Sequence, residues 1–305
     1  MELIKKEVAR IEAYVERFLQ SLDIKNSSKE TYKRQLKAFI CWGTAAHTID
    51  LSRQELMRYK EYLQEKKALS ALSIGGYLTA VRRFFEWLES EKVYPNIAKG
   101  IKGPKRKRGF RKDILTLEQV KELLISIDRS TLDGKRDYAL LNLMIRTGLR
   151  TIEIARALKE DITRQAGQPI LLIHGKGRDS KDEIVLLTEN TLGPIREYLA
   201  SRGKVREQDP IFASHSTKNK GKKLTTRSVS RIAKNRLRAI NIDDNRLTAH
   251  SLRHTAITFS LLAGATPQEA RAMARHADIN TTLIYAHNIN RIEQAPERKI
   301  DEFLE

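Results

Sequence analysis

The chain has few of the residues that crosslink a protein or anchor it in a membrane. Cys41 is its only cysteine in 305 residues, so no disulfide can form within the chain, and a reducing compartment is indicated. No apolar run approaches the ~20 residues that span a bilayer, and the N-terminal segment mixes charges into every helical turn. We therefore expect a cytoplasmic protein with no membrane partner.

Acidic residues are too few to balance the basic ones. Lys and Arg number 57 and Asp and Glu 38, which leaves a net charge of +19 at pH 7. So strong an imbalance favours a polyanionic partner, above all nucleic acid, and a nucleoid-associated location. A basic surface kept for solubility, or for binding a ribosome or a membrane surface, is the alternative. Apolar residues make up 40% of the chain, enough for two domains with a core each.

The first hundred residues have the periodicity of helices. Apolar residues recur at helical spacing from Ile4 to Leu22 and in three later stretches, the last running from Ile74 to Leu88. We expect residues 1–98 to form a compact helical bundle that binds DNA. Its candidate DNA contacts are the helical basic residues Lys33, Lys37, Arg82 and Arg83.

Residues 99–112, KGIKGPKRKRGFRK, form the domain boundary. Eight of these fourteen residues are Lys or Arg and none is acidic, while Gly and Pro interrupt any helix. Like charges repel, so the segment should be extended unless an anion neutralises it. We favour a strap along a phosphate backbone, with Lys105, Arg106, Lys107 and Arg108 as its contacts, over a merely solvated linker.

Residues 113–305 should form a second domain that is also mainly helical. Its one β signal is a pair of apolar runs, PILLI and EIVLL, which are separated by the polar stretch HGKGRDSKD and indicate a β-hairpin. Helices are expected around 190–201, 226–239, 250–263, 267–277 and 279–287. Thr266 should begin one of them, because Pro267 follows at the first turn and Glu269 can complete a capping box.

Four segments of this domain carry candidate catalytic residues. They are TGLRTIE with Arg150, HGKGRDS with Lys176, HSLRH with His250 and Arg253, and ARHADINTTLIYAH with His276 and Tyr285. Taken singly, each has an ordinary structural interpretation: a helix cap, a solvated lysine, a surface pair three residues apart on a helix, and a packing tyrosine.

Together and in this order, the four segments resemble those of the tyrosine recombinase (phage integrase) family, which includes the Xer recombinases. The resemblance covers the whole chain. It implies an N-terminal helical core-binding (SAM-like) domain followed by a catalytic domain. It also implies that Tyr285 is the nucleophile and that the activating residues are Arg150, Lys176, His250, Arg253 and His276. Glu153 matches an acidic position that supports the first arginine without contacting the substrate.

Two positions depart from the family pattern. Ala274-Arg275-His276 stands where the family commonly has Leu-Gly-His, and Ala249 precedes His250 where the family often has proline. Neither change removes a reacting group. Arg275 could add a phosphate contact or alter how tightly the last helices pack.

The chemistry of these residues agrees with the resemblance. Two guanidinium groups can each grip non-bridging phosphate oxygens bidentately, and two histidines can donate to the same developing charge. Lys176 is suited to protonate the departing 5′ oxygen, and a 3′-phosphotyrosine would conserve the bond energy without ATP. We expect no cofactor and no metal. A zinc site at His250, His254, His276 and His287 is disfavoured because two arginines share the same place.

Several alternatives stay open at this level. The chain could be a DNA-binding regulator that does not cut, or a type IB topoisomerase that relaxes DNA as a monomer. The family resemblance favours a homo-tetramer on two DNA duplexes that carry a specific core site. It leaves open an accessory protein and the biological role: dimer resolution, phage integration or transposon movement. The apolar C-terminal tail could fold onto its own domain or dock into a neighbouring protomer.

Overall fold

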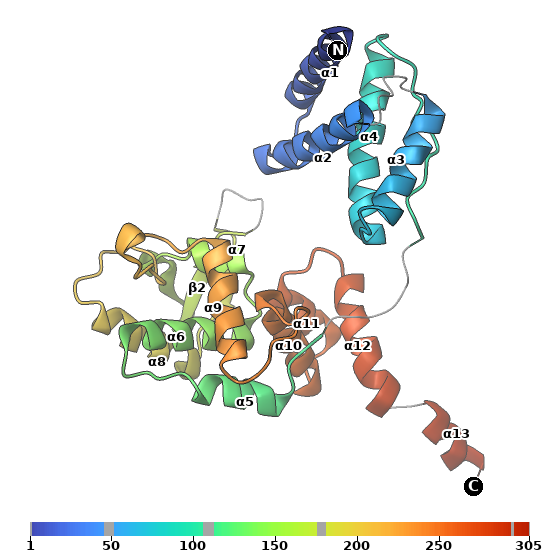
Figure 1. Cartoon of the computed structure of the whole chain (residues 1–305). Helices are drawn as coiled ribbons and strands as arrows, with labels where there is room; N and C mark the ends of the chain where they lie inside the picture. Colours follow the sequence, from blue (N-terminus) through green and yellow to red (C-terminus); the bar gives the residue numbers. More distant parts are fainter. Residues whose placement is uncertain (1, 46–51, 106–112, 176–180, 294–295, 305) are drawn as a thin grey trace. The chain divides into compact units, whose positions relative to one another are not determined.

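The computed structural model describes residues 2–45, 52–105, 113–175, 181–293 and 296–304, without the side chains of 2–7 and 287–299. The chain divides into two compact units, Met1–Gly109 and Phe110–Glu305 (Figure 1). The described part is mostly helical with one small sheet, so the predicted fold class is confirmed. None of the described helices is long and apolar enough to cross a membrane.

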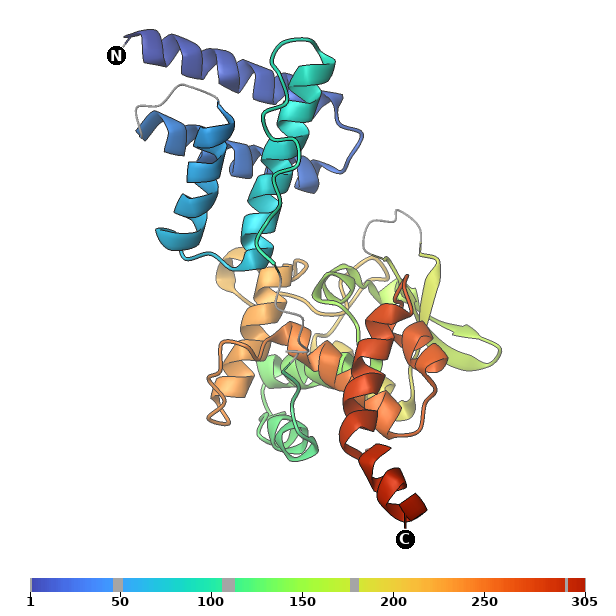
Figure 2. The same ribbon diagram turned by 90° about the vertical axis from the view of Figure 1, so that its right-hand side faces the viewer.

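The first unit is a bundle of four helices around an aromatic core. The helices are α1 (Glu2–Ser21), α2 (Asn26–Ala45), α3 (Arg53–Glu65) and α4 (Ala71–Ser90). α2 packs against α1 and α4, and Figure 2 shows α3 beside α4. Phe39 and Tyr59 meet edge to face with their ring centroids 5.0 Å apart, and Phe18, Phe84 and Phe85 also lie in the core, among aliphatic side chains such as Leu36 and Leu78. The apolar periodicity of the sequence is thus the buried face of each helix.

The start of the basic segment belongs to this first unit. Ala98 and Ile101 are buried in its core, and the Arg53 guanidinium donates to the carbonyls of Ile97 (3.3 Å) and Lys99 (2.6 Å). Residues 106–112, which include Arg106, Lys107 and Arg108, lie outside the described residues. The structure therefore describes only residues 99–105 of the segment predicted to lie along the DNA backbone.

The second unit is built around α6. Its helices are α5 (Leu117–Ile125), α6 (Leu132–Thr147), α7 (Thr151–Arg156), α8 (Glu189–Ser201), α9 (Thr226–Arg238), α10 (Ala249–Leu262), α11 (Pro267–Ala274), α12 (Asn280–Glu293) and α13 (Pro296–Leu304), with short 3₁₀ turns at Lys159–Asp161 and Thr217–Asn219. α6 is buried along most of its length and packs against α8 and α10 (Figure 1). The capping box predicted at Thr266 is present, with its hydroxyl and the Glu269 carboxylate bonded reciprocally to backbone N–H groups.

The sheet has three antiparallel strands in the order β1 (Ile162–Gln165), β2 (Gln168–Ile173) and β3 (Glu183–Leu186). β2 and β3 are the two runs predicted to pair, and Ile173 lies opposite Glu183. The sequence pattern does not predict β1, because only Ile162 of its four residues is apolar. Ala166 and Gly167, both with positive φ, form the tight turn from β1 to β2.

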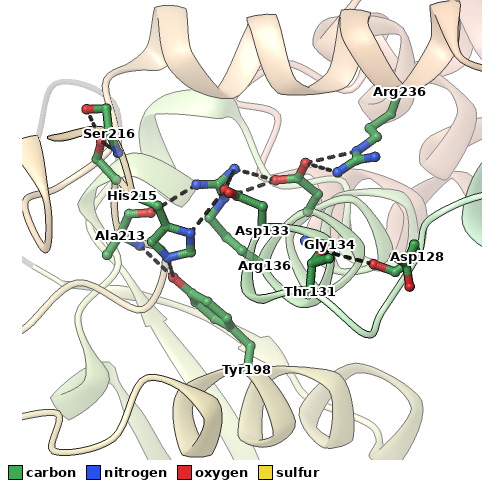
Figure 3. A network of polar contacts seen from close by, with 12 residues as sticks. Asp128, Thr131, Asp133, Gly134, Arg136, Tyr198, Ala213, His215, Ser216 and Arg236 are labelled. Atoms are coloured by element: carbon green, nitrogen blue, oxygen red, sulfur yellow. Dashed lines mark hydrogen bonds and ion pairs between the residues drawn. The ribbon is translucent and has the colours of Figure 1, made fainter.

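A buried ion-pair network joins three helices of the second unit at the N-terminal half of α6. The Asp137 carboxylate accepts from Arg136 at 2.9 and 2.7 Å through one oxygen, and from Arg236 of α9 at 2.9 and 2.7 Å through the other (Figure 3). Arg136 and Asp137 are both buried. A buried carboxylate held by two guanidiniums is satisfied only while both partners are in place, so α6 and α9 are fixed to each other.

The same network extends to α8 through His215. Its Nδ1 lies 3.0 Å from Asp133 of α6 and its Nε2 lies 2.9 Å from the buried hydroxyl of Tyr198 on α8 (Figure 3). Burial and the charge of Arg136 lower the pKa of His215, although Asp133 opposes them. The segment around His215 is therefore pinned to α6 and α8.

Candidate active site

The end of α6 places Arg150 at the surface of the second unit. Gly148, with φ of 62°, caps α6 by donating its N–H to the Met144 carbonyl at 2.9 Å. This left-handed conformation strains any residue with a side chain, so glycine suits the break. The next residues are the buried Leu149 and then Arg150, the first residue of the turn into α7. Arg150 keeps 26% of its side chain exposed, so it can still reach a ligand.

Arg253 approaches the same place from α10. Its guanidinium donates to the carbonyl of Gly148 at the end of α6 and to the carbonyl of Ala274 at the end of α11. Burial, followed by the charges of Arg150 and Arg275, lowers the pKa of Arg253 to about 9. Three guanidinium groups held this close create a strongly positive point, and an anion that bound there would relieve their repulsion.

Glu153 lies beneath these arginines and is completely buried as a side chain. One oxygen pairs with the Arg150 Nη1 at 2.7 Å, and the other accepts from the Arg150 backbone N–H at 2.8 Å and from the Arg275 Nη2 at 3.1 Å. Burial opposes its ionisation, but the charge of Arg275 and the bonds and charge of Arg150 together lower the pKa of Glu153. Glu153 thus contributes a fixed negative charge that orients both arginines.

Tyr285 of α12 is buried against α10. Its hydroxyl is hydrogen-bonded to His254 Nδ1, and the ring is 1% exposed. Burial raises the pKa of Tyr285 to about 12, although the charge of Arg253 opposes this rise. The hydroxyl is therefore protonated near neutral pH and shielded from solvent.

Two histidines, His254 and His276, contact this tyrosine, and a third, His250, contacts His254. The His254 ring meets the His250 ring edge-on at 4.4 Å, and the His276 ring stacks on Tyr285 with centroids 6.4 Å apart. His276 Nδ1 lies 2.9 Å from the Thr282 hydroxyl, which helps to fix the ring orientation. His250 is exposed at the surface of α10, whereas Arg253, three residues later, is buried.

Most of the residues expected to act together do lie together. Arg150, Glu153, Arg253, His276 and Tyr285 converge from α7, α10, the end of α11 and α12, and His250 joins them through His254. Lys176 lies outside the described residues, between β2 and β3. The four candidate DNA contacts of the first unit, Lys33, Lys37, Arg82 and Arg83, are all exposed. Lys33 pairs with Glu16 at 2.6 Å, and Arg83 donates to the Tyr32 hydroxyl at 3.2 Å.

The structure places two further residues in the site: His254, to which the sequence assigns no catalytic role, and Arg275, for which the sequence leaves open a phosphate contact or an effect on the packing of the last helices. His254 follows Arg253 directly, and only its contact with Tyr285 distinguishes it from a packing residue. Arg275 is visible in the sequence only as a departure from the family pattern. Among the described residues, no group of three or more His, Cys, Asp or Glu side chains is arranged to hold a metal ion.

Comparison with known families assigns the class of protein. Residues 113–291 match the phage integrase family, and residues 13–94 match the N-terminal SAM-like domain of phage integrases. The chain therefore belongs to the phage integrase family, the tyrosine recombinases. Its activity is that of a DNA strand-transfer enzyme that recombines DNA at specific sites.

Within this family, the chain is similar to Xer recombinases. It is 30% identical to tyrosine recombinase XerD of Listeria monocytogenes serotype 4b over 90% of both chains, and 28% identical to XerC of Herpetosiphon aurantiacus over 93% of this chain and 94% of that one. The XerH recombinase in its post-cleavage complex with a palindromic difH substrate has the same fold, with a TM-score of 0.72 and 22% identity over 91% of this chain and 80% of that one. A lambda integrase dimer bound to a core site gives a TM-score of 0.67 at 16% identity over 90% and 76%.

Proposed function

We propose that Tyr285 is the nucleophile of this recombinase and that Arg150 and Arg253 bind the scissile phosphate. The observation that carries the proposal is the convergence of the two guanidiniums beside this tyrosine. Arg150 donates to the carbonyl of Arg275 at 3.1 Å and Arg253 to that of Ala274, so both are anchored on consecutive peptide groups. Preorganised cations at a developing phosphorane charge are usually the largest catalytic contribution.

The remaining roles follow from the bonds that must form and break. The Tyr285 oxygen attacks phosphorus, and the 5′ oxygen leaves with a proton from Lys176. A 5′ hydroxyl of the partner strand then attacks the 3′-phosphotyrosine and releases the tyrosine. One reciprocal pair of such exchanges forms a Holliday junction, and a second pair resolves it. His250 and His276 donate hydrogen bonds to the phosphate. Each step exchanges one phosphodiester for another, so the reaction needs no ATP, and the arginines supply the charge that a metal would otherwise supply.

Tyr285 must leave its contact with His254 before it can attack a phosphate on the surface of the protein. We propose that DNA binding and assembly draw α12 outward and expose the hydroxyl. Once it has left His254, the hydroxyl gives its proton to solvent or to another base as it attacks phosphorus; until then the bond to His254 holds it in the protein interior. This arrangement keeps a buried, protonated tyrosine inactive in the free protein.

The partner that we propose is double-stranded DNA with a specific core site, bound by a homo-tetramer that holds two duplexes. The tail supports this assembly. Ile300, Phe303 and Leu304 of α13 are 55%, 88% and 76% exposed, so their apolar surface is not covered by their own domain. A pocket of about 460 Å³ lies between α5, α6 and α10. Its lining includes the apolar residues Leu117, Val120, Leu124, Ile145, Phe259 and Met273, with Lys121, Arg146, Thr188 and Ser260 among the polar ones. We propose that this pocket receives the tail of a neighbouring protomer.

We further propose a cytoplasmic, nucleoid-associated role in chromosome dimer resolution or in the integration and excision of a mobile element. The likeness to XerD and XerC favours a recombinase of the Xer type. The basic first unit and the basic segment after it are suited to hold the DNA backbone around such a site.

The proposal is tested by trapping the covalent intermediate. The purified chain is incubated with restriction fragments of the genomic DNA that flanks its gene, with EDTA and without ATP, and SDS-resistant complexes are isolated and sequenced. We expect adducts at one or a few defined positions, a free 5′ hydroxyl at the break, and a nucleotide attached to the peptide that contains Tyr285. Adducts that form only with a divalent metal, or on another residue, would contradict it. Sequence-independent nicking that relaxes plasmids would instead identify a topoisomerase.

A further inference from the structure

Arg275 occupies an unusual position for an arginine. It follows the last turn of α11 with φ of 53° and ψ of 49°, the left-handed conformation that favours glycine. Its side chain is only 5% exposed. A strained backbone and a buried cation both destabilise the folded state, so this guanidinium must make contacts that offset them.

Those contacts are with the groups that hold the catalytic arginines. The Arg275 Nη2 donates to Glu153 Oε2 at 3.1 Å, and its Nη1 donates to the Met273 carbonyl at 2.7 Å. The Arg275 carbonyl in turn accepts from Arg150 Nη2 at 3.1 Å. Arg150 is thus held twice by residue 275, once through the shared Glu153 carboxylate and once directly.

Arg275 also faces the β2–β3 hairpin. Its Nε is buried without a hydrogen-bond partner among the described residues, and it lies 3.6 Å from Glu183 Oε2 at the start of β3. Lys176 precedes β3 in the same hairpin. One side chain therefore links the strand that follows the proposed general acid to the carboxylate beneath Arg150.

We propose that Arg275 is a positioning residue for strand cleavage, which holds Glu153 and through it sets the orientation of Arg150 toward the phosphate. This inference rests on the proposed function. A direct phosphate contact is the competing role. Burial, and the use of both terminal nitrogens on protein acceptors, favour positioning over contact.

The main test compares three variants on a nicked duplex that carries the cleavage site mapped for the wild type. Arg275→Asn removes the charge but keeps a residue that tolerates the left-handed conformation. Its single-turnover cleavage rate at saturating DNA should fall by about tenfold to a hundredfold, the scale of a misplaced catalytic group, with nearly unchanged DNA affinity. Arg275→Lys should be intermediate, because one ammonium cannot span both acceptors. Arg196→Asn removes an exposed arginine of α8 and should cleave like the wild type.

The dependence on Glu153 gives a second, more specific readout. If Arg275 acts through this carboxylate, adding Arg275→Asn to a Glu153→Gln protein should lower its cleavage rate little further. The dependence of the cleavage rate on pH gives a further test, because its direction can be predicted. Glu153 faces Arg150, Arg253 and Arg275, and Glu183 lies on the other side of Arg275. Without the Arg275 charge, the pKa of Glu153 should be higher than in the wild type, because burial is then opposed by Arg150 but no longer by Arg275, so the variant should lose activity at a higher pH than the wild type does as pH falls.

Thermal unfolding of each variant shows whether it is folded, and Arg275→Lys serves if Arg275→Asn is not. A normal cleavage rate in the folded variant would overturn the inference. Weakened DNA binding with a normal cleavage rate at saturating DNA would also overturn it, because Arg275 would then be a DNA contact. A third contradicting result would be a full further loss of cleavage rate when Arg275→Asn is added to Glu153→Gln. If the wild type itself forms no adduct on its mapped fragments, the proposed function fails, and this inference with it.

Discussion

Arg150 and Arg253 differ in how much freedom the structure leaves them. Arg253 is buried and bonded to two backbone carbonyls, whereas Arg150 is partly exposed and held mainly by Glu153. The Arg253 side chain is thus fixed in place at the base of the site, whereas the Arg150 side chain can adjust to a bound phosphate. Burial, and after it the repulsion between the arginines, lowers the pKa of Arg253, and a bound anion would relieve that repulsion.

Removing either arginine should slow cleavage far more than it weakens binding. We expect Arg150→Ala and Arg253→Ala each to reduce the single-turnover cleavage rate by about 10²–10³ or more, because a preorganised charged donor is removed. DNA affinity, measured by mobility shift, should fall much less, since many other basic residues contact the backbone. Near-normal cleavage by either variant would exclude the proposed site.

The sequence is sufficient to propose Arg150, Arg253, His276 and Tyr285, because the segments that carry them occur together and in the order that the family resemblance requires. It cannot assign His254 or Arg275. The His254–Tyr285 contact joins residues 31 positions apart, and the Arg275–Glu153 contact joins residues 122 positions apart. Both contacts therefore form only after α7, α10, α11 and α12 have packed together. A residue that acts through its neighbours leaves no local pattern.

At the scale of elements, α6 connects two polar centres. Its N-terminal half carries Asp133, Arg136 and Asp137, and its C-terminal end is the Gly148 turn before Arg150. Over 16 residues a helix spans roughly 24 Å, so the ion-pair network lies well away from the site. It should stabilise the fold without taking part in the chemistry.

Breaking this network should therefore cost stability. Asp137→Ala leaves Arg136 and Arg236 without their shared carboxylate, and we expect the free energy of unfolding to fall by about 3–5 kcal/mol. Asp243→Ala is the matched control, because the Asp243 side chain is 59% exposed and its ion pairs with Arg238 and Lys234 should contribute at most about 1 kcal/mol. Urea unfolding of both variants measures the difference; equal losses would contradict a structural role for the buried network.

The secondary structure of the sheet shows where sequence patterns stop being informative. The apolar runs predict β2 and β3, but β1 is a polar edge strand defined by its pairing with β2. The segment 99–112 is a similar case, because its composition predicts a boundary but not the burial of Ile101 in the first unit.

The basic segment itself should contribute to DNA affinity by neutralising phosphates. Replacing Lys105, Arg106, Lys107 and Arg108 with Ser should weaken binding and reduce the slope of log K against log salt by about 0.9 for each phosphate that is no longer neutralised. Mobility-shift titrations over a range of salt concentrations measure the slope. An unchanged slope would mean that the segment is only a solvated linker.

At the scale of the whole molecule, the exposed apolar tail is the feature that a single copy does not explain. Phe303 and Leu304 end α13 in solvent, and leaving such surface in water is unfavourable by about 25 cal/mol per Å². The tail follows α12, which carries Tyr285. A neighbour that holds the tail could therefore also control when the nucleophile is exposed.

Deleting residues 297–305 should leave binding to a single site intact but abolish paired-site complexes and recombination. The Phe303→Asp variant should behave in the same way, because it removes the aromatic surface that docking would bury and adds a carboxylate that must be desolvated. Native gels with one-site and two-site DNA separate these effects. Wild-type recombination by the truncated protein would show that the tail does not connect protomers.

The most direct test of the proposed mechanism is covalent attachment by Tyr285 itself. Tyr285→Phe removes one oxygen and keeps the packing of the ring, so the variant should bind its mapped site almost as the wild type does. On a nicked duplex with that site, the wild type should give an SDS-resistant protein–DNA complex, and the Phe variant should give none. An SDS-resistant complex formed by the Tyr285→Phe protein would show that another residue attacks the DNA.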